Sequence, residues 1–209
     1  EYLDYRKEFA LAKKQAYTGK FPIFIELEAS YYCDLKCPFC AREANFGDRD
    51  IGHMPPEIWK KILDESKEKG LKSINMAHEG ESLMNPRLFQ MIKEAKDAGV
   101  IDIFLHTNAN MMTPEISERL IDCGITKINF SIDASTEETY KILRVGGDFK
   151  QVIKNVQDFL KIKLEKKASY LRCRVSFVAQ QENLHEKKDF FEFWKDQKGV
   201  NLITFQNLI

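Results

Sequence analysis

Residues 31–40 read Tyr-Tyr-Cys-Asp-Leu-Lys-Cys-Pro-Phe-Cys and directly follow an apolar run at 22–29 that is typical of a β-strand. Three cysteines, Cys33, Cys37 and Cys40, therefore lie within eight residues, separated by three and then by two residues. Thiolates are the usual protein ligands of iron–sulfur clusters and of zinc. This triplet indicates a metal centre just after the first predicted strand.

The spacing leaves several kinds of site open. Structural zinc normally takes four protein ligands, so a zinc site would have to recruit a histidine such as His53 or His78. A cluster that only carries electrons would need a fourth, remote ligand. Three thiolates on a four-iron cube would leave one iron open to a substrate or cofactor. Three unrelated structural cysteines are the remaining alternative.

The other two cysteines do not join this group. Cys123 falls on the apolar face of a predicted helix and Cys173 within a predicted strand, where a free cysteine behaves as a small buried hydrophobe. Five is an odd number, whereas disulfide frameworks normally use an even, dispersed set in a short secreted chain. The cysteines thus point to metal binding or catalysis in a reducing compartment.

The composition favours one soluble, cytoplasmic domain. The chain has 209 residues, 44% of them hydrophobic, which is enough to bury a core. It has no apolar run of about 18 residues that would span a membrane, and residues 1–20 lack the apolar centre of a signal peptide. Lysine plus arginine equals aspartate plus glutamate at 32 each, so no nucleic acid is expected as a partner, just as the missing apolar run leaves no membrane expected.

Short β-rich runs alternate with amphipathic helical patterns along the chain. Thr113-Pro114 places a capping side chain before a proline suited to the first helical turn. Asn183 followed by Glu186 is typical of a capping-box variant that opens the last helix. A first helix is expected at 1–17. The six predicted strands are 22–29, 73–78, 102–107, 127–132, 171–179 and 202–207.

Strands separated by helices imply right-handed crossovers and a parallel sheet. Six such strands fit either a doubly wound sheet or an incomplete barrel, and the periodicity does not choose between them. The chain ends directly after the sixth predicted strand, although a parallel strand is normally covered on both faces. We therefore expect a C-terminal portion beyond Ile209.

The cysteine segment resembles the signature of the radical S-adenosylmethionine enzymes, Cys-x3-Cys-x-aromatic-Cys, with Phe39 at the aromatic position. The resemblance extends over essentially the whole chain. It implies that Cys33, Cys37 and Cys40 hold a [4Fe–4S] cluster and that S-adenosylmethionine chelates the fourth iron. One electron from a flavodoxin- or ferredoxin-type reductant would then cleave this cofactor to methionine and a 5′-deoxyadenosyl radical, which abstracts a substrate hydrogen.

A segment after the second predicted strand, His78-Glu79-Gly80-Glu81-Ser82, resembles the family's Gly-Gly-Glu-Pro motif. Gly80 and Glu81 match it, whereas Glu79 and Ser82 depart from it. In the family this motif receives the methionine ammonium, which has three donors and suits carbonyls and a carboxylate. The resemblance thus assigns Gly80 and Glu81 to cofactor binding, with an ordinary acidic loop as the alternative.

Three further strand ends carry residues that the resemblance assigns to the cofactor. Asn108 follows the third strand in a segment similar to the family's Thr-Asn-Gly and would face cofactor or substrate. Ser131, Asp133 and Arg144 resemble the family's Ser-x-Asp followed by Arg-x-Gly, in which serine and arginine bind the methionine carboxylate. Val178 ends the fifth strand, where relatives line the adenine pocket.

The resemblance implies an α/β fold, a partial (β/α)6 TIM-like barrel with parallel strands. Residues 1–20 would form an N-terminal helix and lead-in, and 21–209 the radical S-adenosylmethionine domain. The motif order is similar to the SPASM or twitch branch, whose members carry a cysteine-rich C-terminal extension and act on peptides or sugar-type small molecules.

Two competing functions remain. An RNA-modifying radical enzyme would need a positive surface, which a net charge of zero does not favour. A non-enzymatic electron carrier would leave the polar strand ends unexplained. His78 and His106 are candidate acid–base groups on the substrate side, with a local structural role as the alternative.

Overall fold

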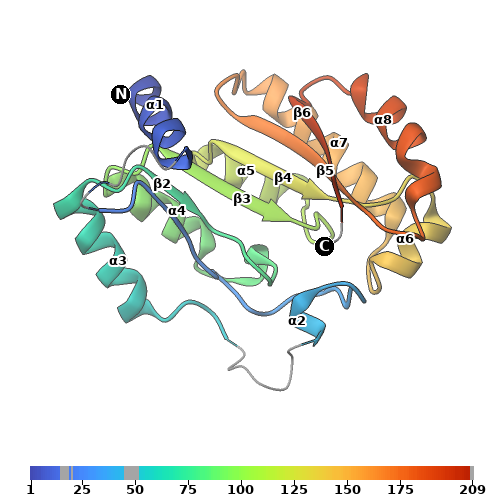
Figure 1. The fold of residues 1–209 in the computed structure, drawn as a ribbon, viewed down its shortest axis with the longest axis horizontal. Coiled ribbons are helices and arrows are strands. Elements are labelled where there is room, and N and C mark those ends of the chain that lie inside the picture. The colour runs from blue at the N-terminus through green and yellow to red at the C-terminus, as the bar shows by residue number, and fades with distance from the viewer. Residues whose placement is uncertain (15–18, 20, 45–51, 208–209) are drawn as a thin grey trace.

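The computed structural model describes residues 1–14, 19, 21–44 and 52–207. Its centre is one sheet of six strands whose order across the sheet follows their order along the chain (Figure 1). All neighbouring strands are parallel. The six predicted strands are therefore confirmed. They are β1 (Phe24–Glu26), β2 (Ser73–Asn75), β3 (Asp102–Thr107), β4 (Lys127–Ser131), β5 (Arg172–Ala179) and β6 (Leu202–Asn207).

The first two strands are shorter than the apolar runs that predicted them. β1 ends at Glu26 and β2 at Asn75, although the two runs continue to positions 29 and 78. The chain after β1 stays attached for one more residue, since Leu27 N donates to Asn75 O at 3.0 Å. The residues beyond leave the regular ladder and enter the loops that form the site described below.

The helices are α1 (Tyr2–Lys13), α2 (Ala41–Ala44), α3 (Pro56–Lys69), α4 (Leu88–Asp97), α5 (Pro114–Cys123), α6 (Glu137–Leu143), α7 (Phe149–Glu165) and α8 (Lys187–Lys195), with short 3-10 helices η1 (Ser82–Met84) and η2 (Leu184–Glu186). Helices α3 to α8 form a layer on one face of the sheet. Ile74, Leu105 and Phe130 point from the strands into this layer and are fully buried. They share one hydrophobic cluster with Trp59 of α3 and Val156 of α7.

The other face of the sheet is concave and polar. Because side chains alternate across a strand, the residues between the core positions point to this side. His106, Asn129 and Arg174 are neighbours across β3, β4 and β5 and belong to this set. A doubly wound sheet would reverse its strand order and carry helices on both faces. The sequential order with one main helical layer confirms the predicted partial barrel.

Helix α1, at the upper left of Figure 1, covers the end of the barrel where the strands begin, which we call the lower end. Tyr5 Oη donates to Asp102 Oδ2 at 3.1 Å, at the first residue of β3. The helix predicted at 1–17 is confirmed over Tyr2–Lys13. Positions 15–18 lie outside the described residues.

The predicted capping box at Asn183 and Glu186 is wrong. Asn183 fastens the loop after β5 instead, with Nδ2 donating to Val178 O at 2.9 Å. The Glu186 carboxylate accepts hydrogen bonds from the hydroxyls of Thr136 and Thr139 at the start of α6. Both residues are of types that cap helices, but here their hydrogen-bond partners come from other segments of the fold.

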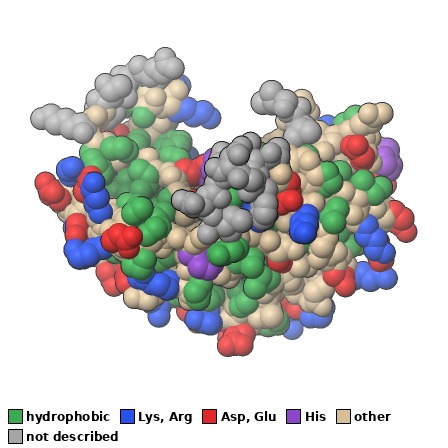
Figure 2. Space-filling view, turned by 90° about the horizontal axis from the view of Figure 1, so that it is seen from below, with side chains coloured by type: hydrophobic (Ala, Val, Ile, Leu, Met, Phe, Trp, Pro, Cys, Tyr) green, Lys and Arg blue, Asp and Glu red, His purple; other side chains and the backbone are tan. Residues whose placement is uncertain are grey.

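Acidic and basic side chains are interspersed on the face of the molecule that Figure 2 shows, with apolar side chains between them. This pattern agrees with the equal totals of 32 acidic and 32 basic residues. No helix in the described ranges is both long enough and apolar enough to cross a membrane.

Candidate active site

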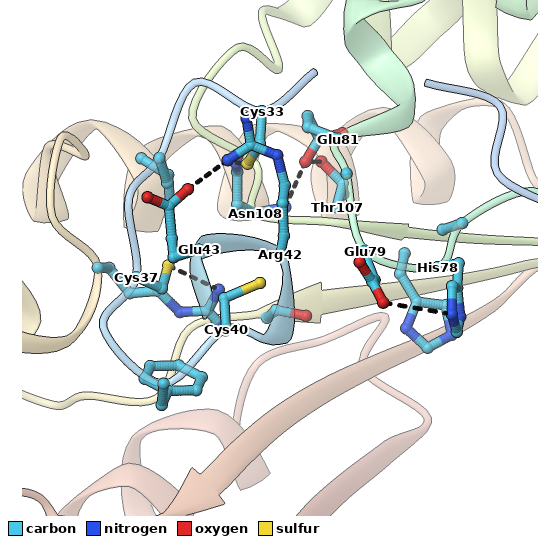
Figure 3. Close-up of a pocket in the computed structure, with 17 residues that line it drawn as sticks. Cys33, Cys37, Cys40, Arg42, Glu43, His78, Glu79, Glu81, Thr107 and Asn108 are labelled. Atoms are coloured by element: carbon cyan, nitrogen blue, oxygen red, sulfur yellow. Dashed lines mark hydrogen bonds and ion pairs between the residues drawn. The ribbon is translucent and has the colours of Figure 1, made fainter. Parts of the chain in front are cut away.

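Three cysteines line one pocket at the carboxyl ends of the strands (Figure 3). Cys33, Cys37 and Cys40 lie on the loop after β1 and border a cavity of about 260 Å³. Backbone hydrogen bonds hold this loop, since Lys36 N donates to Val145 O at 2.8 Å and Cys40 N to Cys37 O at 3.0 Å. The triplet that was close in sequence is thus also brought together in space.

Most of the other predicted cofactor residues border the same pocket. They are Phe39, Gly80, Glu81, Asn108, Ser131 and Arg144, which come from separate loops and strand ends. His78 and His106, the candidate acid–base groups, also lie in its wall. Asp133 and Val178 are not among the residues that border the pocket; Asp133 pairs with Arg144, and Val178 N donates to Asp133. Residues of the wall that the sequence did not single out include Leu35, Arg42, Glu43, Ala77 and Thr107.

Only glycine fits at position 80. A Cβ atom there would lie 2.0 Å from the carbonyl oxygen of Ser30, far inside contact distance. The next residue, Glu81, donates its backbone N–H to Tyr32 O at 2.8 Å. The loop after β2 therefore packs directly on the cysteine loop, which explains why the two motifs share one pocket.

Glu81 is a buried carboxylate that receives three hydrogen bonds. Oε2 accepts from Asn108 N at 2.8 Å and from Thr107 Oγ1 at 3.1 Å, and Oε1 accepts from Leu83 N at 3.1 Å. Figure 3 shows the carboxylate beside Thr107 and Asn108. Burial raises the pKa of Glu81 to about 7, although these hydrogen bonds oppose the rise. The side chain is thus fixed between the loops that follow β2 and β3.

Asp34 links the cysteine loop to the loop after β3, and the sequence did not indicate this role. Asn108 Nδ2 donates to Asp34 Oδ1 at 2.7 Å, and Asn110 Nδ2 donates to Asp34 Oδ2 at 2.8 Å. The same Asn108 nitrogen lies 3.9 Å from Cys33 Sγ. Neither segment contains a pattern that predicts this contact, because the two loops are far apart in the sequence and meet only in the folded barrel.

Arg42 is a second buried arginine in the wall. Its Nε donates to Tyr31 O at 2.8 Å, and its guanidinium pairs with Glu43. These contacts fasten α2 onto the start of the cysteine loop. The sequence shows only that Arg42 lies two residues after Cys40. An arginine near a cysteine is common, so this position alone does not predict a role.

Arg144 is held in place by an aspartate with an unusual backbone. Asp133 has a φ of 65°, in the left-handed region that residues other than glycine seldom adopt. One carboxylate oxygen accepts from Val178 N at 2.8 Å, and the other pairs with the Arg144 guanidinium. Arg144 Nη1 lies 3.7 Å from Cys37 Sγ. Arg144 is 9% exposed, and its buried Nε has no hydrogen-bond partner among the described residues.

The donor set fits an iron–sulfur cluster better than a single zinc ion. One zinc binds each sulfur at about 2.3 Å, so its thiolates must lie within about 4.6 Å of one another. Within the described ranges, no three His, Cys, Asp or Glu side chains converge to hold one ion. His53 Nδ1 lies 3.1 Å from Ser30 Oγ, and His78 Nδ1 lies 2.9 Å from Glu26 Oε1. Thiolates bound to separate irons of a cube need no such convergence.

Comparison with known proteins agrees with this geometry. Residues 27–193 match the family model of the Radical SAM superfamily. The chain belongs to this superfamily. Its members use a [4Fe–4S] cluster and S-adenosylmethionine, so the expectation drawn from the cysteine signature is confirmed at this level. The curated relatives that the chain matches are named as enzymes.

Two curated relatives show how much of a longer protein this radical SAM chain matches. It is 30% identical over 164 residues to a probable GTP 3′,8-cyclase of Methanocaldococcus jannaschii, covering 78% of this chain and 52% of that protein. It is 28% identical over 185 residues to an AdoMet-dependent heme synthase of Methanosarcina barkeri, covering 88% and 50%. The chain thus spans about half the length of the curated relatives it matches.

A solved structure shares the fold. Streptococcus suis SuiB bound to S-adenosylmethionine superposes with a TM-score of 0.69 at 22% identity, covering 98% of this chain and 44% of that one. At this identity the likeness shows the fold alone. It agrees with the six-stranded parallel sheet of this chain.

Proposed function

We propose that this chain is the catalytic core of an enzyme that cleaves S-adenosylmethionine reductively and abstracts a hydrogen atom from an organic substrate. The observation that carries the proposal is the common pocket, in which three thiols of one loop face polar side chains from the other strand ends. Cys33, Cys37 and Cys40 hold the cluster in this proposal. When bound, the cluster supplies the electron for the cleavage and one open iron for the cofactor.

The polar groups around the thiols suit the two charged ends of methionine. Glu81 is proposed to present its fixed carboxylate to the ammonium, and Gly80, in the same pocket wall, to offer backbone groups beside it. Ser131 and Arg144 are proposed to bind the carboxylate. A carboxylate would also satisfy the buried Nε of Arg144, which the chain leaves without a partner among its described residues.

The remaining predicted residues are proposed to shape the site. Phe39 lies beneath Arg144, with the guanidinium carbon 5.4 Å from the ring centroid. Asp133 orients Arg144, and Asn108 faces the pocket beside the cysteine loop. The amide of Val178 is already bound to Asp133, so any contribution of Val178 to the adenine side is apolar.

The proposed substrate is a peptide or a small molecule. The relative from M. jannaschii is named for GTP, and SuiB has also been solved with its precursor peptide SuiA. A flavodoxin- or ferredoxin-type protein is the proposed reductant, and the cytoplasm is the proposed location because all five cysteines are free thiols. Residues 1–20 are the proposed lead-in and 21–209 the proposed barrel domain. Nucleic acid is not part of the proposal.

Anoxic turnover tests this function. Purified protein, reconstituted with iron and sulfide, is incubated with S-adenosylmethionine and dithionite, and the products are separated by liquid chromatography. We expect equal amounts of 5′-deoxyadenosine and methionine, and none without reductant. A protein that holds about four irons but forms no 5′-deoxyadenosine would overturn the proposal in favour of an electron carrier.

A further inference from the structure

A second cavity opens on the concave side of the sheet, at the lower end of the barrel. It measures about 510 Å³ and lies beside the first residues of β4, β5 and β6. Four of its lining side chains are cationic, namely Arg6, Lys127, Arg172 and Arg174. We call this cavity the lower chamber.

The strand register explains why these charges gather. Phe104, Lys127 and Arg172 are neighbours across β3, β4 and β5. Arg174 stands two residues further along β5 and therefore points to the same concave face. Arg6 reaches the chamber from α1, which covers this end of the barrel (Figure 1).

The chain does not balance the charge of the lower chamber. Lys127 pairs with Asp102, but Arg6, Arg172 and Arg174 form no ion pair with any residue that the structure describes. The whole chain has a formal net charge of zero. Three guanidinium groups without acidic partners at one cavity are therefore a local feature and not a reflection of the composition.

Arg174 is the most constrained of the three. Its Nε donates to Asn129 Oδ1 at 2.7 Å, and its guanidinium carbon lies 5.2 Å from the ring centroid of Phe104. The two terminal nitrogens have no hydrogen-bond partner among the described residues. A guanidinium oriented in this way presents a fork that matches a carboxylate or a phosphate in bidentate geometry.

The lower chamber adjoins the cysteine pocket. Phe104 borders the chamber and His106 borders the pocket, and their ring centroids are 4.4 Å apart. Ser131, also in the pocket wall, stands two residues further along the sheet than Arg174, a rise of about 7 Å at ~3.3 Å per residue. Ser131 stands four residues further along the sheet than Arg172, which corresponds to a rise of about 13 Å. One elongated ligand can therefore reach both sites.

We propose that the lower chamber binds an anionic group of the substrate, a carboxylate or a phosphate, while the remainder extends past His106 to the cysteine pocket. The inference rests on the proposed function, because it takes the substrate to react at that pocket. Arg174 makes the two-pronged contact, and Arg172 and Arg6 balance the remaining charge. The substrate class is then a small molecule whose anionic group lies about 7–13 Å from the reacting carbon.

Anion binding to the reconstituted protein tests the chamber without turnover. Tripolyphosphate and citrate are titrated separately by calorimetry at low ionic strength, without reductant. We expect one site per chain for at least one probe, and a loss of tenfold or more in affinity for Arg174→Gln and for Arg172→Gln. The affinity of Arg174→Lys should lie between those of the wild type and Arg174→Gln, because lysine keeps the positive charge but lacks the two-pronged guanidinium.

The two probes separate the two chemistries. Binding of tripolyphosphate alone assigns a phosphate, and binding of citrate alone a carboxylate. Binding of both supports a shared anion site, and binding of neither overturns the inference. Unchanged affinity in both glutamine variants also overturns it. Arg172 is exposed, so Arg172→Gln keeps the test valid if Arg174→Gln does not fold.

The matched control is Arg119→Gln. Arg119 lies on α5 and stacks on Phe89 at 3.9 Å, away from both cavities, so anion affinity should stay at the wild-type value. The proposed function is judged separately, by 5′-deoxyadenosine formation in the wild-type protein. Anion binding without cleavage of S-adenosylmethionine would contradict the radical function but not the anion site. Cleavage without anion binding would contradict only the proposed anion site in the lower chamber.

Discussion

The guanidinium of Arg144 lies against the thiol of Cys37, with Nη1 3.7 Å from Sγ. Asp133 holds the same guanidinium through a buried ion pair. Burial raises the pKa of Cys37, and the positive charge of Arg144 opposes this rise. A fixed cation beside the sulfur favours the thiolate, which is the form that binds iron. Arg144 therefore connects the proposed cofactor pocket to the cysteine loop.

Arg144→Lys should weaken S-adenosylmethionine binding by about tenfold to a hundredfold. A buried charge-assisted hydrogen bond contributes roughly 1.5–3 kcal/mol, and an ammonium does not reproduce the fork of a guanidinium. Affinity is measured by equilibrium dialysis of iron-loaded protein under anoxic conditions. Lysine is preferred to alanine here, because removing the charge would leave Asp133 buried without its partner, at a cost of about 3–5 kcal/mol.

Arg119→Lys serves as the control for this experiment, since Arg119 stacks on Phe89 outside the pocket. Iron content should stay near normal in both variants. If Arg144→Lys binds the cofactor as tightly as the wild type, Arg144 does not contact its carboxylate.

Serine at any one of Cys33, Cys37 or Cys40 should remove most of the iron. Each thiolate would hold a separate iron of a cube with about four irons, so the loss of one ligand destabilises the whole cluster. Iron and sulfide are quantified after anoxic reconstitution. Cys123→Ala and Cys173→Ala should keep their iron, because both residues are buried in the hydrophobic core. Equal iron loss in these two variants would contradict the assignment of Cys33, Cys37 and Cys40 as the three ligands.

Gly80→Ala should lower the free energy of unfolding by at least about 1–3 kcal/mol and weaken cofactor binding. The new methyl group would overlap the Ser30 carbonyl oxygen at 2.0 Å, and this oxygen belongs to backbone that cannot turn away. Chemical denaturation and equilibrium dialysis measure the two effects. Gly52→Ala is the comparison, since a Cβ at position 52 meets nothing within 4 Å. Equal behaviour of the two variants would contradict the packing of this loop.

Stability should fall below about pH 6.5 because of His106. Burial lowers the pKa of His106 to about 4, with Arg174 adding to the shift and Glu26 opposing it. In the unfolded chain a histidine has a pKa of about 6.5. Between these values the unfolded chain binds a proton that the folded chain does not, so acid favours unfolding. The loss approaches about 3 kcal/mol near pH 4, at ~1.4 kcal/mol per pKa unit, and vanishes above about pH 6.5.

Urea denaturation at several pH values measures this dependence. His106→Gln should flatten the curve between about pH 6.5 and pH 5, because the variant has no imidazole to protonate. The same slope in wild type and variant would show that His106 is not held neutral by burial.

The sequence by itself determined the order of elements and the chemistry of the cysteine loop. Both are local properties, since an amphipathic helix or a β-rich run is recognised from its own residues. Thr113 illustrates this, because its hydroxyl accepts from Ile116 N at 3.3 Å and caps α5 as predicted. Gly124 likewise ends α5 in the left-handed conformation, with a φ of 88°. Three thiols within eight residues indicate a metal or iron–sulfur site, wherever the fold places the loop.

Only the tertiary structure decided which strand ends meet and which face each charge occupies. Asp34 and Asn108 are 74 positions apart, and no pattern in either segment encodes their hydrogen bond. Val178 is predicted on the adenine side of the cofactor pocket, and only the structure shows that its amide donates to Asp133. Arg174 enters the lower chamber because of the β4–β5 register, and a shift of one residue would turn it into the core. Register depends on packing between distant helices and strands, which no local stretch of sequence contains.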